Sequence, residues 1–289
     1  MASADVLVRA AAGETLSAEE RAAIDRALPA VWQAVNAGPL DVAGLAEQAA
    51  CDAADLARFH IPLGQFLVAR AAESNLRCLV AIAGLPAGGK SVFTALMVRV
   101  LRALMPPCGV SAFGLDGYHY PNAYLAAHRT PPGVAVAGSL RPYKGAHFTF
   151  NVLRLAADLR RLRACDAPVA LPAYDRTLHE PVEGAIVVWP ADRLVLVEGN
   201  YLLHRADGWA EVSDLFDLRL FLDLLRGANR ERMIARHMRG GRRRDDAVAH
   251  FDRTDGPNTA LVAATQAAAD LVVRLDAGYR VVGIAANRP

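Results

Sequence analysis

The stretch CLVAIAGLPAGGKS, residues 78–91, decides the fold. Residues 78–84 form a short continuous apolar run that ends in glycine, which is typical of a strand buried on both faces of a parallel sheet. Residues 84–91 match the pattern G-x-x-x-x-G-K-[ST] in full, and a helical pattern follows from Lys90 to about Met105. A strand, a glycine-rich turn and a helix in this order form a phosphate-binding loop, because main-chain N–H groups and the helix N-terminus face the bound anion.

The residues of this loop have separate expected roles. The side chain of Lys90 is expected to reach the β- and γ-phosphate oxygens of a nucleotide, and the hydroxyl of Ser91 is expected to bind Mg²⁺. Only two of the 32 basic residues are lysines, Lys90 and Lys144, so the motif holds one of the few lysines in the chain. The residues expected to bind the nucleotide are Gly84, Ala87, Gly88, Gly89, Lys90, Ser91 and Val92.

Strands and helices alternate after this loop. The predicted elements are buried strands at 109–115, 193–200, 218–223 and 270–275, the last as the final core strand, a small excursion of strands at 168–175 and 185–189, and helices at 149–164 and about 228–238. Such alternation predicts an α/β fold with a doubly wound, mostly parallel sheet flanked by helices.

The chain divides into two parts in this interpretation. Residues 1–76 are predicted to form a helical N-terminal extension, in which Ser17 and Glu20 give a capping box. The extension carries no chemical constellation and is expected to pack on the main domain or to serve as a dimer arm. Residues 77–289 are predicted to form the main domain, with an arginine-rich lid at about 226–246.

Composition restricts the partners. The 289 residues are 53% hydrophobic and 21% charged with a net charge of +2, which indicates a globular protein whose main partner is neither nucleic acid nor a membrane. A small-molecule substrate is the partner expected, and a homodimer is left open. The N-terminus lacks a signal-peptide pattern, and no apolar run is long enough to cross a membrane.

The cysteines bear on the compartment. Cys51, Cys78, Cys108 and Cys165 are widely spaced and form no C-x-x-C pair. This spacing indicates neither a zinc site nor a disulfide framework. Reduced thiols in a cytoplasmic protein are therefore predicted.

Two acidic residues lie at the ends of predicted strands. Asp116 follows the strand at 109–115, and Glu198 lies near the end of the strand at 193–200. Both are expected near the phosphate-binding loop, because ligands of open parallel sheets bind beyond the carboxyl ends of the strands. Asp116 is predicted to accept a proton from an attacking hydroxyl or to help hold the metal, and Glu198 to bind Mg²⁺ or its water. A simple turn-initiating role is the alternative for Asp116.

The arginine-dense segment at 226–246 is the candidate lid. Arg232 and Arg236 lie four residues apart and share a helix face. Guanidinium groups suit phosphoryl oxygens, so both are predicted to be catalytic lid residues. A solvated basic helix face is the alternative.

The long loops between strands hold the candidates for a polar-metabolite pocket. These substrate-binding candidates are Tyr118, His119, Lys144, Tyr174, Arg176 and His179. Simple packing is the alternative for Tyr174, and a surface position is the alternative for His179.

A set of motifs in order resembles one superfamily of kinases. The motifs are GLPAGGKS, LDGYHYPN, KGAHFTF, PAYDRTLHEPVEGAI, LVLVEGNYLL and the arginine-rich stretch. Over residues 76–285 the chain resembles uridine kinase, phosphoribulokinase and bacterial pantothenate kinase. Within this superfamily it is most similar to the nucleoside/nucleotide kinase-like proteins of the fructose-transport-system kinase type.

The resemblance implies a fold, cofactors and an activity. It implies a P-loop α/β fold, ATP and Mg²⁺, and transfer of the γ-phosphate to a hydroxyl of a nucleoside, a sugar or a pantothenate-like metabolite. It also implies that Asp116 is the base, that Tyr174 and His179 belong to the substrate pocket, and that Arg232 and Arg236 belong to the lid.

The chain departs from its relatives at three positions. His147 stands where they usually have proline, Asn151 where they usually have aspartate, and Arg176 where uridine kinases usually have an aromatic residue. The acceptor is therefore open. A nucleotide-dependent switch without a small-molecule acceptor is the alternative, although no N-K-x-D guanine-reading motif occurs. A pseudoenzyme that only senses a ligand is a third interpretation.

Overall fold

The computed structural model describes residues 3–42, 44–73, 75–105, 109–131, 138–164, 166–224 and 229–287. The main sheet in this part of the chain consists of β3 (Cys78–Gly84), β4 (Gly109–Gly114), β7 (Asp192–Glu198), β8 (Leu218–Leu224), β9 (Leu271–Leu275) and β10 (Val281–Ala286). Two hairpins lie outside it, namely β1 (Leu40–Val42) with β2 (Leu45–Glu47), and β5 (Val169–Asp175) with β6 (Glu180–Val188).

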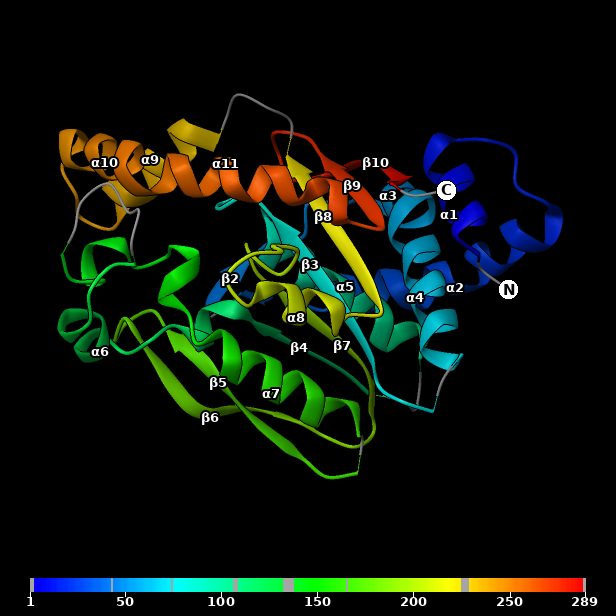
Figure 1. Cartoon of the computed structure of the whole chain (residues 1–289). Coiled ribbons are helices and arrows are strands. Elements are labelled where there is room, and N and C mark those ends of the chain that lie inside the picture. The colour runs from blue at the N-terminus through cyan, green and yellow to red at the C-terminus, as the bar shows by residue number, and fades with distance from the viewer. Residues whose placement is uncertain are drawn as a thin grey trace.

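Helices surround this sheet. They are α1 (Ala4–Ala12), α2 (Ala18–Val35), α3 (Ala53–Asp55), α4 (Ile61–Ala72), α5 (Lys90–Leu104), α6 (Asn122–Ala127), α7 (Val152–Arg163), α8 (Trp209–Asp214), α9 (Asn229–Arg239), α10 (Arg244–His250) and α11 (Gly256–Ala264). Figure 1 shows the sheet between the helices, with the N-terminal helices at one end of the molecule.

The sheet follows the order β10–β9–β8–β3–β7–β4. The pairs β4–β7, β7–β3, β3–β8 and β8–β9 are parallel, and β10 is antiparallel to β9. The predicted doubly wound, mostly parallel sheet is confirmed. The prediction that residues 270–275 form the last core strand is wrong. The chain turns back because Asp276 Oδ1 accepts hydrogen bonds from the main-chain N–H groups of Gly278 and Arg280, and β10 then extends the sheet.

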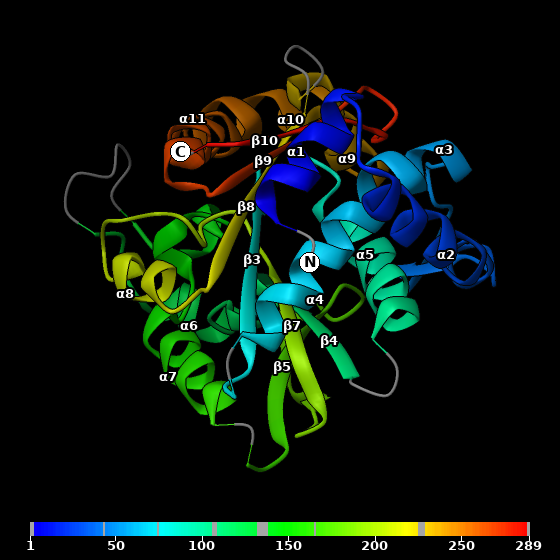
Figure 2. The same cartoon turned by 90° about the vertical axis from the view of Figure 1, so that its right-hand side faces the viewer.

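The central strand β3 is buried along its whole length. Val80 and Ile82 belong to a hydrophobic cluster with α4 and α5, whereas Leu79 and Ala81 belong to a second cluster with α7 and α8. Figure 2 shows these helices on opposite sides of the sheet. Apolar side chains on both faces explain why the sequence of this strand is continuously apolar rather than alternating.

The N-terminal part packs on the α5 side. Leu7 of α1, Val31 of α2 and Leu63 of α4 lie in the same hydrophobic cluster as β3 and α5. The capping box at the start of α2 is present: the hydroxyl of Ser17 accepts from the main-chain N–H of Glu20, and the Glu20 carboxylate accepts from the N–H of Ser17. The prediction of a helical segment is wrong for residues 40–42 and 45–47, which form the strands β1 and β2 of a hairpin, with β1 packed against α5. The domain division at residue 76 and the homodimer stay predictions.

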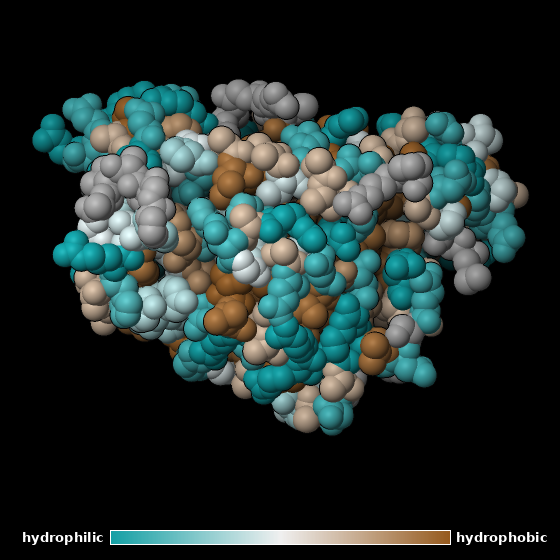
Figure 3. Space-filling view, in the orientation of Figure 1, coloured by the Kyte–Doolittle hydropathy of each residue, from teal (hydrophilic) through white to brown (hydrophobic). Residues whose placement is uncertain are grey.

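The helices α9, α10 and α11 follow β8 and lie beyond its end, at the top of both ribbon views. The surface over α9 and α10 is mostly hydrophilic (Figure 3). Residues 226–228 of the predicted lid lie outside the described residues. Among the helices that the structure describes, none is both long and apolar enough to span a membrane.

Candidate active site

The phosphate-binding loop joins β3 to α5 through a tight turn. The N–H of Gly88 donates to the carbonyl of Leu85 at 3.0 Å, which closes the turn. Gly89 precedes the helix with a φ of 82°, a left-handed conformation that glycine adopts without steric cost. A Cβ on Gly84 would lie 2.7 Å from the carbonyl oxygen of Leu222, so a larger residue would push β8 away. Both glycines of the motif are therefore required by the local geometry.

Lys90 is folded back against this loop. Its ammonium donates to the carbonyls of Gly84 at 3.1 Å and Leu85 at 2.9 Å, and to Asn200 Oδ1 at 2.6 Å. The Lys90 residue is buried, with 8% of its surface exposed. These contacts hold a positive charge at the mouth of the loop. Asn200 was not among the predicted site residues, although it directly follows the Glu198-Gly199 pair.

Ser91 and Glu198 meet beside the loop. The hydroxyl of Ser91 donates to Glu198 Oε1 at 2.8 Å. Parallel pairing of β3 with β7 places Ile82 opposite Glu198, so the carboxylate lies next to the start of α5. Burial raises the pKa of the Glu198 carboxyl, the charge of Lys90 opposes this shift, and the Asp116 carboxylate adds to it.

Asp116 lies in a 3-10 turn, Leu115–Tyr118, directly after β4. Its side chain is exposed and lines a cavity of about 580 Å³ together with Ser91, Glu198, Tyr174 and Arg176. The structure therefore brings the two predicted carboxylates and the loop serine to one space. This arrangement follows from the sheet, because β4 and β7 are neighbours and end on the same side.

The far wall of this cavity comes from residues that the sequence analysis did not select. Thr94 and Arg99 of α5 line it, and so do Leu40–Val42 of the N-terminal hairpin. Arg99 donates to the carbonyls of Val35 and Pro39, which fixes the segment that leads into β1. Nothing in the local sequence of the hairpin marks this position, because the contact joins segments about sixty residues apart.

A second cavity, of about 680 Å³, lies between the segments that carry His119, Lys144 and Tyr174 and the segment at 237–255. Its lining from the loops includes His119, Arg141, Lys144 and Tyr174. On the other side it is lined by residues of α9, of α10 and of the turns that follow each of them, namely His237, Arg242, Asp246, Ala249, His250, Arg253 and Asp255. Basic side chains outnumber acidic ones, so the cavity favours a negatively charged ligand.

Three of the predicted substrate residues form one group in this second cavity. The Lys144 ammonium lies 5.0 Å from the centre of the Tyr174 ring and donates to Asn122 Oδ1 at 2.8 Å. The His119 ring stacks on Phe150 and meets Tyr174 edge-on, with centroids 5.7 Å apart. Burial lowers the pKa values of His119 and Lys144 and raises that of Tyr174 to about 12.

The structure places other predicted residues elsewhere. Tyr118 is 1% exposed, belongs to the core cluster that contains α7, and donates a hydrogen bond from its hydroxyl to Asp158. It is therefore a core residue. His179 is exposed and offers its main-chain carbonyl to Lys144 at 2.7 Å. The guanidinium of Arg232 lies over the ring of Tyr279. The side chain of Arg236 and the residues Cys108 and Cys165 lie outside the described residues.

A comparison with models of known protein families gives no match. Individual proteins do match. The chain is 34% identical over 237 residues to YggC of Escherichia coli (strain K12), which covers 82% of this chain and 94% of YggC. It is 27% identical to a candidate uridine kinase, C227.14, of Schizosaccharomyces pombe, over 68% of this chain and 83% of that protein. A pantothenate kinase of Enterococcus faecalis is 26% identical over 50% of this chain and 44% of its own length.

Solved structures share the fold. The crystal structure of a candidate fructose transport system kinase from Silicibacter sp. TM1040 matches with a TM-score of 0.61 at 28% identity, over 71% of this chain and 93% of that chain. YFH7 of Saccharomyces cerevisiae, described as a P-loop containing kinase, also matches with a TM-score of 0.61, over 74% of this chain and 98% of that chain. Its sequence identity is 13%, so this match shows a shared fold alone. The chain therefore belongs to one family with YggC, its homologues include uridine kinase-like and pantothenate kinase proteins, and its structural neighbours are P-loop kinases.

Proposed function

We propose that this chain is an ATP-dependent kinase that transfers the γ-phosphate to a hydroxyl of a small metabolite. The observation that carries the proposal is the shared cavity lined by Ser91, Glu198 and Asp116. The proposed triphosphate site therefore borders the same cavity as the Asp116 carboxylate, which is able to accept a proton. Relatives named as uridine and pantothenate kinases support the same reaction class.

The residues beside the loop suit Mg²⁺. A serine hydroxyl and a carboxylate supply the oxygen ligands that this cation prefers. The half-buried Glu198 carboxyl has a raised pKa, and a cation beside it would favour the ionised form. Ser91 and Glu198 would hold the ion, which when bound neutralises negative charge on the phosphates.

Other residues of the chain would bind the phosphates, accept the proton and stabilise the transferred charge. Main-chain N–H groups of residues 84–91 bind the phosphates, and Lys90 turns its ammonium from the loop carbonyls to the phosphate oxygens. Asp116 accepts the proton of the acceptor hydroxyl as its oxygen attacks the γ-phosphorus. Arg232, held over Tyr279 next to the loop, lies where a lid cation could stabilise the transferred charge.

The second cavity favours an acceptor that carries a negative charge in addition to its hydroxyl. Arg141 and Lys144 line it on one side, and Arg242 and Arg253, which follow α9 and α10, line it on the other. A carboxylate or phosphate group on the acceptor would pair with these side chains. We therefore propose that anionic acceptors, such as hydroxy acids like pantothenate and phosphorylated sugars, are better substrates than neutral sugars and nucleosides.

A panel assay tests the proposal. ATP consumption is measured with Mg²⁺ and, one at a time, nucleosides, neutral sugars, sugar phosphates, pantothenate and glycerate. We expect one anionic member to stimulate turnover and to appear as a phosphorylated product. Equal ATP hydrolysis with every compound would favour the nucleotide-dependent switch, and ATP binding without turnover would favour the ligand sensor.

A further inference from the structure

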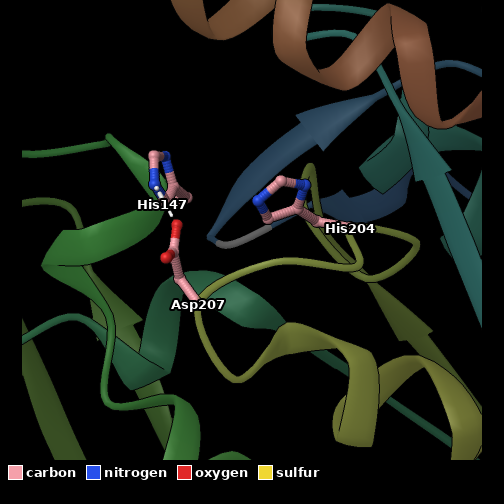
Figure 4. Close-up of side chains that lie close together, drawn as sticks. All are labelled: His147, His204 and Asp207. Atoms are coloured by element: carbon pink, nitrogen blue, oxygen red, sulfur yellow. Dashed lines mark hydrogen bonds and ion pairs between the residues drawn. The ribbon is translucent and has the colours of Figure 1, made fainter.

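Two loops near the candidate active site bring a pair of histidines and an aspartate together. His147 opens the 3-10 turn His147–Thr149, and His204 and Asp207 lie in the loop between β7 and α8. One ring nitrogen from each histidine and one carboxylate oxygen of Asp207 all lie within 4.8 Å of one another. Figure 4 shows the three side chains converging from these two loops. The proposed kinase reaction uses none of them.

The histidine nitrogens are poorly satisfied. Within the described residues, Nδ1 of His147 and Nε2 of His204 are buried and have no hydrogen-bond partner. Only 9% of the His204 surface is exposed. A buried polar nitrogen without a partner costs free energy, and native proteins hold few of them. The unpartnered Nε2 of His204 points to a ligand, and the ring of His147 lies beside it with 5.4 Å between the ring centroids, so one ligand could bind both rings.

We infer that His147, His204 and Asp207 bind a divalent transition-metal ion such as Zn²⁺. Two imidazoles and one carboxylate match the donors that Zn²⁺ prefers, whereas Mg²⁺ and Ca²⁺ prefer oxygen ligands alone. Three protein ligands leave a fourth position for water. The histidines must be neutral to bind, and burial lowers the pKa of both rings.

The geometry allows an ion to enter. His147 Nε2 and Asp207 Oδ2 lie 3.1 Å apart, which is close to the spacing of about 3.3 Å between ligand atoms around tetrahedral zinc. The side chain of Asp207 is 65% exposed, so it can rotate and opens the cluster to solvent. A small contraction around the more deeply buried His204 completes the set.

Such an ion would tie two segments of the active site together. The loop that carries His204 also contains Asn200, whose Oδ1 accepts a hydrogen bond from Lys90. The turn that carries His147 begins three residues after Lys144, which lines the second cavity. The hydroxyl of Tyr201 already donates to the carbonyl of Gly145 at 2.7 Å and links the same segments. The metal would therefore brace the walls of the site without touching a substrate.

A second cluster provides a matched control. His237 of α9, His250 at the end of α10 and Asp255 of the turn after α10 also lie within 4.8 Å of one another. There, however, Asp255 satisfies the ring of His237 at 2.6 Å and approaches Nε2 of His250 at 3.9 Å. Among the described residues, neither His237 nor His250 has a buried ring nitrogen without a hydrogen-bond partner, unlike His147 and His204, so we expect this cluster to bind metal less well.

Cobalt titration tests the site. The full-length chain, free of any affinity tag and stripped with a chelator, is titrated with Co²⁺ and followed by visible absorption. We expect one Co²⁺ per chain with the intense bands of four-coordinate cobalt, displaced by Zn²⁺. His204→Asn and His147→Asn should lose this signal, and Asp207→Asn should weaken binding by about 10- to 100-fold. His237→Asn should bind as the unaltered chain does.

Melting curves in chelator show whether each variant is folded. If His204→Asn does not fold, the exposed Asp207→Asn decides the question. The proposal is overturned if the unaltered chain binds no Co²⁺, if His204→Asn or Asp207→Asn binds it undiminished, or if only His237→Asn loses it. Because the readout is metal binding, its failure leaves the kinase proposal standing.

Discussion

The hydroxyl of Tyr279 donates a hydrogen bond to the main-chain carbonyl of Ala87, with 3.2 Å between the two oxygens. The same ring lies against Gly89, where a Cβ would come within 2.6 Å of it, and under the guanidinium of Arg232. The turn between β9 and β10 therefore contacts both the phosphate-binding loop and the lid segment. This contact ties the conformation of the loop to residues near the end of the chain.

Replacing Tyr279 by phenylalanine should weaken ATP binding modestly. The substitution keeps the ring and removes one hydrogen bond of about 0.5–1.5 kcal/mol, so the Kd for ATP should rise roughly two- to tenfold. Isothermal titration calorimetry measures this change. Tyr124→Phe on α6 is the control and should leave the Kd unaltered. An equal effect of both substitutions would contradict a role for the Tyr279 hydroxyl.

The two lysines of the chain should separate donor binding from acceptor binding. Lys90→Ala removes the ammonium from the loop and should abolish turnover. Lys144→Ala should preserve the Kd for ATP and raise the KM for an anionic acceptor, because Lys144 lines the second cavity. Steady-state kinetics with each substrate varied in turn measures both effects. If Lys144→Ala raises the Kd for ATP and does not change the KM for the acceptor, the second cavity does not bind the acceptor.

Asp116→Asn should lower kcat by about 10²- to 10⁴-fold, the usual contribution of general acid–base catalysis. The amide has nearly the same shape as the carboxylate and cannot take the proton, so ATP binding should be largely spared. Asp5→Asn, on the exposed face of α1, is the matched control and should keep full activity. An Asp116→Asn enzyme that works at the normal rate would remove Asp116 from the role of base.

Glu198→Gln should stabilise the protein at neutral pH in the absence of Mg²⁺. Burial raises the folded-state pKa of Glu198 above its ordinary value of 4.5. The protonated Glu198 carboxyl therefore contributes its full stabilisation below the ordinary pKa of 4.5. This stabilisation is lost as the pH rises through the raised pKa of the folded state. Glutamine stays neutral and can still accept the hydrogen bond of Ser91, so the variant does not lose this stability.

Melting temperatures between pH 4 and pH 8 check this expectation. The two proteins should melt alike at the acidic end, and the variant should melt higher at neutral pH. Added Mg²⁺ should raise the melting temperature of the unaltered chain and cancel the difference, because the cation favours the ionised carboxylate. A variant that melts lower at neutral pH without Mg²⁺ would show that the buried carboxylate is stabilising.

Much of the main domain was predictable because its signals are local. The apolar run of β3, the glycine turn and α5 are contiguous, so the backbone preferences of each residue agree with its place in the fold. The positions of Asp116 and Glu198 followed from the rule that parallel strands end on one side of a sheet. The final strand β10 was missed, because its formation depends on the turn at Asp276 and on pairing with β9.

The sequence by itself determined the phosphate-binding loop, the apolar core strands and the two carboxylates at strand ends, since each is a pattern of neighbouring residues. The alternation of these strands with helices then indicated a parallel sheet. Only the tertiary structure decided that the N-terminal hairpin lines the cavity and that Asn200 accepts a hydrogen bond from Lys90. It also decided that Tyr118 is buried and that His147 lies beside His204 and Asp207. These contacts join residues tens of positions apart, and side-chain identity alone does not say which distant loops the fold will bring together.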